Sequence, residues 1–232
     1  MIEMARRHDT AGRSASRGTQ MQKYIIGKNS SVCKRLAKKI PLENYRFLGH
    51  QDISDVTFQQ NDVLFIFSYS LNRQVNADFL TSIHKRGGKN IVLMSSVASK
   101  VATLTQCYNY PTIKYMSEEL VLEKLGGVVI QLGSVVEDSR ELPSGTNYCT
   151  TLDELADFIN QYQPSPSRAI RLFSVIDIPF KSQLDAFLYR SYQVLINRLN
   201  RYPCLLRPVD LLLKLSGYRW YGYTALLKKV WM

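Results

Sequence analysis

The stretch from Ile91 to Val121 constrains the fold more than any other part of the sequence. An apolar run, Ile91-Val-Leu-Met94, ends in two small hydroxyl residues, Ser95 and Ser96. A short polar connection leads to Tyr110-Pro-Thr-Ile-Lys114, where apolar residues begin to recur with a helical period. The pattern predicts a buried strand followed by an amphipathic helix. The end of the strand would then present a serine to a Tyr and a Lys that lie one helical turn apart.

Strand patterns and helix patterns alternate over most of the chain. The expected strands lie at residues 23–27, 45–48, 62–67, 91–94, 127–133 and 171–176. The expected helices lie at residues 34–40, at 74–86, and after Tyr110 and Thr151. The runs at 62–67 and 127–133 are continuously apolar, as in strands buried on both faces. The alternation predicts an α/β protein with a Rossmann-like, doubly wound parallel sheet and helices on both faces. Residues 134–148 are polar and are expected to form a loop.

The two ends of the chain differ from this central region. Residues 1–21 are rich in Arg, Ser, Thr and Gly, so a disordered leader is expected, with an organellar transit sequence as the alternative. The Rossmann-like domain is expected to span residues 22–180. From residue 182 the pattern is helical with breaks at Pro203 and Pro208, which indicates a small, mostly helical C-terminal lobe or tail at 181–232.

The net charge of +11 is concentrated at the chain ends. Residues 187–232 carry eight Arg or Lys against one acid, whereas residues 24–186 carry 17 bases against 16 acids. No nucleic-acid-binding module accompanies the charge, so nucleic acid is not an expected partner. The basic, aromatic residues 187–232 could contact a membrane surface peripherally, pack on the sheet domain, or form a homodimer interface.

Cysteine usage and hydropathy bear on the cellular compartment. The four cysteines are scattered and form no CxxC pair, which favours reduced thiols over a disulfide framework or a metal site. No apolar window is long enough to span a bilayer. We expect a cytoplasmic protein, with peripheral attachment at the inner membrane surface as the alternative.

The first strand ends in a turn of small residues. Gly27 closes the strand, and a helix pattern follows, the order that opens a dinucleotide-binding βαβ unit. Ser30 and Cys33 stand where the Gly-x-x-Gly-x-x-Gly fingerprint has its second and third glycines. Cysteine is small enough for close packing of helix on strand, but serine adds a Cβ where the phosphate would lie. Gly27 as a simple turn glycine is the alternative interpretation.

These features resemble the short-chain dehydrogenase/reductase superfamily, in its extended, atypical branch of nucleotide-sugar epimerases, dehydratases and reductases. The resemblance covers roughly residues 22–180. It rests on Gly27-x-x-Ser-x-x-Cys33, Asp52-Ile-Ser-Asp55, Ser95-Ser96, and Tyr110-Pro-x-x-Lys114 followed by Glu118-Glu119. The Tyr-x-x-x-Lys spacing also occurs at Tyr24 and Lys28, so the position after a buried strand, rather than the motif alone, supports the second pair.

The resemblance implies roles for individual residues. Tyr110 would act as general acid or base on a sugar hydroxyl. Lys114 would lower the pKa of Tyr110 and hold the nicotinamide ribose of NAD or NADP. Ser96, or alternatively Ser95, would hydrogen-bond the reacting oxygen. The implied cofactor contacts are Gly27, Asn29, Ser30, Ser31, Val32, Asp52, Ser68 and Lys114.

The sequence also departs from the family pattern. Two fingerprint glycines are replaced, and Ser68-Tyr-Ser-Leu71 stands where the family has an Asn-Ala-Gly-like turn. Gly49-His50 stands where an acidic residue would end the second strand. The first hypothesis is an NAD(P)-dependent oxidoreductase or epimerase acting on a nucleotide sugar in surface-polysaccharide biosynthesis. The alternatives are a non-catalytic Rossmann-like scaffold of the same pathway and a peripheral membrane module.

Overall fold

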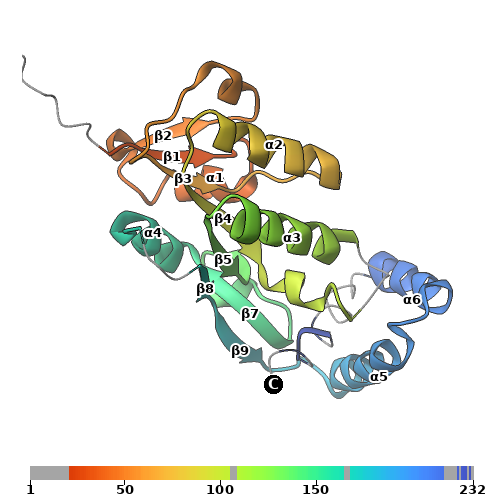
Figure 1. Cartoon of the computed structure of the whole chain (residues 1–232). Coiled ribbons are helices and arrows are strands. Elements are labelled where there is room, and N and C mark those ends of the chain that lie inside the picture. Colours follow the sequence, from red (N-terminus) through yellow and green to blue (C-terminus); the bar gives the residue numbers. More distant parts are fainter. Residues whose placement is uncertain are drawn as a thin grey trace, which may run out of the picture.

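A six-stranded parallel sheet forms the centre of the protein. The computed structural model describes residues 21–104, 109–164, 168–216, 224, 226–228 and 230 (Figure 1). The strands of this sheet are β1 (Lys23–Ile26), β2 (Tyr45–Leu48), β3 (Val63–Ile66), β4 (Asn90–Ser96), β5 (Val128–Leu132) and β8 (Ala169–Leu172). Their order is β2-β1-β3-β4-β5-β8, and every pairing is parallel. The predicted α/β architecture is therefore confirmed.

Helices cover both faces of this sheet, because successive side chains of each buried strand point to opposite faces. Phe65 packs with α1 (Ser31–Leu36) and α4 (Leu152–Gln161) on one face. Leu64 and Ile66 pack with α2 (Arg73–Lys85) on the other. The helix α3 (Asn109–Glu119) follows β4 and continues as a π-helical turn, η4 (Leu120–Lys124). The short 3-10 helices are η1 (Leu42–Asn44), η2 (Gln51–Asp55), η3 (Val97–Val101) and η5 (Ser139–Glu141).

A second, three-stranded sheet lies beside the first. It has the order β6-β7-β9 and consists of β6 (Ser134–Val136), β7 (Gly145–Thr151) and β9 (Ser174–Ile178). The prediction of a loop at 134–148 is therefore wrong at both ends, at 134–136 and 145–148, whereas residues 137–144 connect the two strands with only the short turn η5. The strand β7 has no apolar pattern in the sequence because it buries polar side chains that are hydrogen-bonded. Asn147 donates to the Pro143 carbonyl (2.7 Å), and Thr150 donates to the Leu172 carbonyl. The strand expected at 171–176 is two strands, because the chain changes sheets at Phe173.

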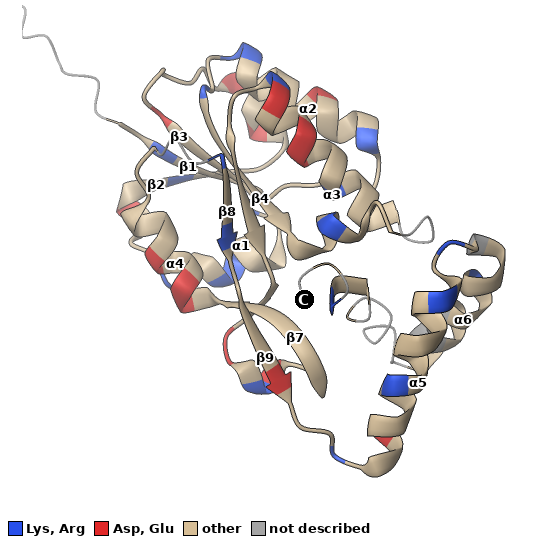
Figure 2. Cartoon of the chain, turned by 60° about the horizontal axis from the view of Figure 1, so that its bottom comes forward, with Lys and Arg blue, Asp and Glu red and all other residues tan. Residues whose placement is uncertain are grey.

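Two helices, α5 (Gln183–Leu199) and α6 (Pro203–Leu215), lie at the end of the molecule far from β2 (Figures 1 and 2). Pro203 begins α6, but the predicted break at Pro208 is wrong, since Pro208 lies inside that helix. Pro208 removes one backbone hydrogen bond from this helix, while Leu206 of the same helix is buried in a hydrophobic cluster. Leu226 and Leu227 are also buried, in a cluster with Val97 and Tyr148, so this part of the C-terminal segment packs on the sheet domain. No described helix is long and apolar enough to cross a membrane.

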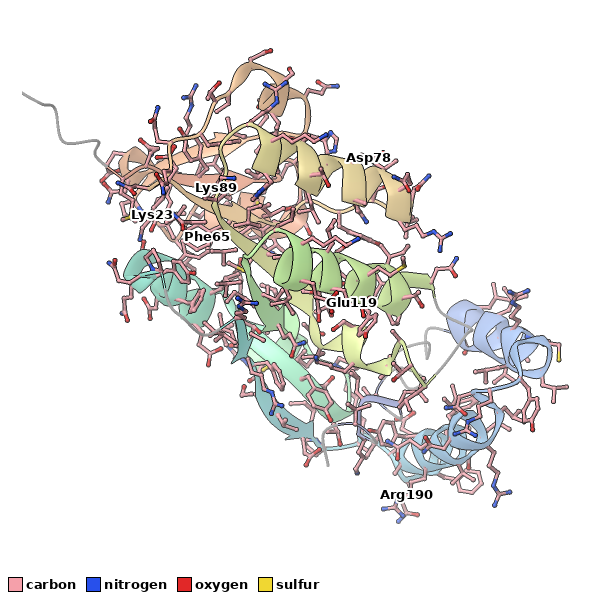
Figure 3. All side chains as sticks on the ribbon, in the orientation of Figure 1. Lys23, Phe65, Asp78, Lys89, Glu119 and Arg190 are labelled. Atoms are coloured by element: carbon pink, nitrogen blue, oxygen red, sulfur yellow. The ribbon has the colours of Figure 1, made fainter. Side chains whose placement is uncertain are left out.

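Lys23, the first residue of β1, is hydrogen-bonded to the C-terminal end of α4, and Figure 3 shows it beside that helix. Its Nζ donates to the carbonyls of Ile159 (3.1 Å), Asn160 (3.0 Å) and Tyr162 (3.4 Å). We expect Lys23→Met to lower the free energy of unfolding by about 1 kcal/mol, because the helix end loses its cation and three carbonyls lose a donor. Urea unfolding measures the change, and the exposed Lys38→Met is the control. Equal effects of the two substitutions would contradict this role.

Candidate active site

The two serines that end β4 point to opposite sides of the strand. Ser95 is buried, and its Oγ donates to Oε1 of the buried Glu118 at 2.5 Å. The other carboxylate oxygen, Oε2, accepts from Nε2 of Gln131 on β5 at 3.2 Å. Ser96 caps the N-terminus of η3, where its Oγ accepts from the Ala98 backbone N–H at 3.3 Å. Ser95 thus belongs to a core network, and Ser96 is the serine on the side of Tyr110.

The core network around Glu118 provides a test that is independent of catalysis. We expect Ser95→Ala to lower the free energy of unfolding by about 1–2 kcal/mol, because a buried carboxylate loses a donor. Ser99→Ala is a matched control, since the Ser99 hydroxyl is buried without a hydrogen-bond partner among the described residues. Its removal should be neutral or stabilising. A similar loss of stability in both variants, measured by chemical denaturation, would contradict a special role for the Ser95–Glu118 bond.

Tyr110 and Lys114 lie one turn apart on α3, as their spacing predicts. The Lys114 side chain is 7% exposed. Its Nζ lies 4.6 Å from the centroid of the Tyr69 ring and 5.8 Å from that of the Tyr110 ring. The two rings meet edge to face at 5.3 Å. The structure therefore brings Ser96, Tyr110 and Lys114 together at the carboxyl end of the sheet, and adds Tyr69.

Burial dominates the electrostatics of these groups. It raises the pKa of the Tyr110 phenol, while hydrogen bonding with the Ser96 side chain opposes the rise and the nearby Tyr69 and Glu118 add to it. The expectation that Lys114 gives Tyr110 a lowered pKa is therefore wrong for the protein alone, because desolvation outweighs the favourable contacts. Burial also lowers the pKa of Lys114 to about 8, although the charge of Glu118 acts in the opposite direction.

The turn after β1 adopts the conformation that its glycine permits. Gly27 has a φ of 115°, and a Cβ at this position would lie 2.9 Å from the Ser68 backbone nitrogen at the end of β3. Ser30 caps α1, where its side chain accepts from the Cys33 N–H at 3.1 Å. Cys33 is buried against the sheet, so it fills the packing position of the third fingerprint glycine. Asn29 and Ser31 are exposed, and Val32 is half-buried.

An ion pair lies at the carboxyl end of β2. Asp52 accepts from Lys28 Nζ at 2.6 Å and from the Gly49 N–H at 2.7 Å. These two contacts hold the pKa of Asp52 below its usual value, the lysine contributing more. Asp52 is thus fixed beside the turn that contains Gly27.

Sequence reasoning did not assign Tyr69 or Lys28 to this edge of the sheet. Both follow the ends of parallel strands, Lys28 after β1 and Tyr69 after β3. Carboxyl ends of adjacent parallel strands meet at one edge, where such folds bind ligands. That rule could have identified both residues once the strand order was known.

Comparison with solved structures identifies the fold. No protein-family model and no curated protein sequence matches this chain. A short-chain dehydrogenase/reductase superfamily protein from Agrobacterium tumefaciens, with bound NAD, superimposes with a TM-score of 0.51 at 10% identity, over 75% of this chain and 82% of that one. This chain therefore shares the Rossmann-like fold of that protein.

Two further solved structures share this fold. The capsular polysaccharide assembling protein CapF from Staphylococcus aureus matches with a TM-score of 0.52 at 14% identity, over 88% of this chain and 65% of that one. The Bordetella bronchiseptica enzyme WbmG, in complex with NAD and UDP, matches with a TM-score of 0.50 at 8% identity, over 70% of this chain and 76% of that one.

Proposed function

We propose that this protein is an NAD(P)-dependent oxidoreductase or epimerase that acts on a nucleotide sugar. The observation that carries the proposal is the convergence of Ser96, Tyr110 and Lys114 at the carboxyl end of β4. A hydroxyl, a phenol and an ammonium from two successive elements form a proton-transfer site in the fold of the dehydrogenases and reductases. Two of the similar structures support a nucleotide sugar as substrate and a place in surface-polysaccharide biosynthesis: WbmG binds UDP, and CapF is a capsular polysaccharide assembling protein.

The side chains have distinct tasks in this proposal. Ser96 holds the reacting oxygen of the sugar by a hydrogen bond. Tyr110 gives its phenol proton to that oxygen in the reducing direction, and takes a proton from the sugar hydroxyl in the oxidising direction. Burial favours the neutral phenol, so Tyr110 is poised as the acid in the protein alone.

The residues at the edge of the sheet fit a nicotinamide dinucleotide. Gly27 is already in the left-handed conformation of the turn, and the Ser30 hydroxyl is turned back toward the Cys33 N–H. Lys114 is a buried cation that makes no ion pair with a described residue. When bound, the nicotinamide supplies the redox chemistry by exchanging a hydride with a sugar carbon. Lys114 would hold its ribose, and Gly27, Asn29, Ser30, Ser31, Val32, Asp52 and Ser68 would line the remainder.

A non-catalytic binding protein with the same fold is the second candidate. One observation favours it: the Tyr69 ring lies over the Lys114 ammonium, the group that would hold the ribose. Tyr69 is 41% exposed, and its ring also contacts the edge of the Tyr110 ring at 5.3 Å. If Tyr69 keeps this position, the protein would bind a nucleotide sugar without turning it over.

Incubation of the purified protein with UDP-, GDP- and dTDP-sugars tests the proposal. Each sugar is combined with NAD, NADP, NADH or NADPH, the nicotinamide absorbance is followed, and products are separated by chromatography and mass. Conversion of at least one sugar, dependent on nicotinamide, supports an enzyme. Sugar binding by calorimetry without conversion would instead support the non-catalytic protein, and the absence of both would contradict each candidate.

A further inference from the structure

The helices α5 and α6 expose an exceptional share of the apolar surface. Eight of the fifteen large apolar side chains that are exposed among the described residues lie between residues 184 and 215. Isolated exposed apolar residues are ordinary, but a contiguous set marks an interaction surface. These two helices therefore need a partner that accepts apolar side chains.

Each of the two helices turns one face to the core and an apolar face to the solvent. In α5, Tyr189 and Ile196 are buried, whereas Leu184, Phe187 and Val194 are 51–65% exposed and share the opposite face. In α6, Leu206 is fully buried. The exposed face of α6 carries Leu205, Leu211, Leu212 and Leu215, which are 54–76% exposed. A solvent-facing helix would instead carry polar residues there.

Arginines border this apolar face. Arg190 and Arg198 lie three and four residues after Phe187 and Val194, hence on the same side of α5, and Arg201 and Arg207 are exposed nearby. Figure 2 shows basic colour on both helices, and Figure 3 shows the labelled Arg190 directed away from the body of the protein. Residues 183–216 contain five Arg or Lys against two acids. The surface of α5 and α6 is thus both apolar and cationic.

We infer that α5 and α6 form a docking surface for an anionic lipid bilayer. Leucines would enter the region between headgroups and acyl chains while arginines contact lipid phosphates, as in helices that lie in the plane of a membrane. A second copy of the chain fits less well, because its arginines would face those of the first. Leu226 and Leu227 are buried, so the exposed faces of the two helices, rather than these C-terminal residues, make the contact. This inference does not depend on the proposed enzyme activity.

Co-sedimentation of the full-length protein with vesicles tests the inference. Vesicles of phosphatidylcholine alone are compared with vesicles that also contain phosphatidylglycerol. We expect binding to the anionic vesicles and little to the neutral ones. Added salt should weaken the binding, because it screens exposed charges. No binding to anionic vesicles would overturn the inference.

Substitutions on the two helices locate the surface. L212S combined with L215S should lower vesicle binding at least about tenfold, because two inserted leucines are lost. R198Q combined with R201Q should lower it by roughly fivefold for each arginine. The control is L42S combined with L71S, which removes two leucines that are 54% and 73% exposed elsewhere and should leave binding unchanged.

Two results would contradict the inference even if vesicles are bound. One is an equal loss of binding in the Leu42/Leu71 variant. The other is a homodimer, seen by light scattering, that the Leu212/Leu215 variant disrupts while its vesicle binding is unchanged. Thermal unfolding of each variant verifies that it is folded, as expected for substitutions of exposed side chains.

Discussion

Replacing Tyr110 by phenylalanine is expected to lower kcat by roughly 10²–10⁴-fold, the range for removal of a positioned acid or base. The kcat is measured with the nucleotide sugar that the wild-type protein converts in the assay described above. The substitution removes one hydroxyl and keeps the ring, so the edge-to-face contact with Tyr69 at 5.3 Å is retained. The free energy of unfolding should therefore change little, and the loss of turnover can be assigned to the phenol.

Tyr115→Phe is the matched control for this experiment. Tyr115 is the next tyrosine on α3, and its pKa is raised chiefly by a hydrogen bond with Glu119, away from Ser96. Its hydroxyl has no task in the proposed proton transfer, so kcat should be unchanged. Turnover that survives in the Tyr110 variant, or falls equally in both variants, would remove Tyr110 from the catalytic role.

Replacing Lys114 by methionine is expected to stabilise the fold by about 2 kcal/mol near pH 7. Burial lowers the pKa of Lys114 from 10.5 to about 8, and this difference corresponds to about 3 kcal/mol of cost for the buried charge. The variant loses the cation contacts on the Tyr69 and Tyr110 rings. This loss reduces the expected stabilisation by about 1 kcal/mol. A residue that weakens the fold in this way is typical of a functional site.

The stabilisation by Lys114→Met is expected to depend on pH. Below pH 8 the lysine is protonated in both the folded and the unfolded chain, so the folded protein carries the full cost of the charge. Between pH 8 and 10.5 the unfolded chain binds more protons, and the stability of the wild type rises with pH. The advantage of the methionine variant should therefore shrink over this interval.

Chemical denaturation of the wild type and the Lys114→Met variant at pH 7 and pH 10 measures how the stability difference changes with pH. The lowered pKa of Lys114 lies between these two pH values. The exposed Lys124, on the turn that follows α3, provides the control variant Lys124→Met. That variant should show no advantage that depends on pH in this way. A Lys114→Met protein that is less stable than the wild type at pH 7 would show that the buried ammonium stabilises the fold instead.

The sequence predicted the elements that hold the site because their patterns are strong. The continuous apolar runs of β3, β4 and β5 are typical of buried strands. The helical period of apolar residues after Tyr110 is typical of an amphipathic helix. The juxtaposition of Tyr110 and Lys114 follows from the spacing of one helical turn. The strand β7 was not predicted because Asn147 and Thr150 are polar and buried. The hydrogen bonds that they donate, to the carbonyls of Pro143 and Leu172, form only in the folded chain.

Side-chain direction and environment could not be predicted as well. Which of Ser95 and Ser96 faces Tyr110 depends on where Glu118 and Gln131 lie, and β4 pairs with β5 in a register that sets Ser95 opposite Gln131. The upward shift of the Tyr110 pKa depends on burial by surrounding elements. Tyr69 enters the site from the end of β3, 41 residues before Tyr110, and no local pattern connects the two.

Titration of the protein with NADH and NADPH, followed by the fluorescence of the nicotinamide, tests most directly whether this edge of the sheet is a cofactor site. We expect saturable binding of at least one of the two nucleotides, weakened at least about tenfold by Lys114→Ala and unchanged by Lys124→Ala. The absence of binding at millimolar nucleotide, or equal affinity in the wild type and the Lys114 variant, would contradict the proposed role of this site.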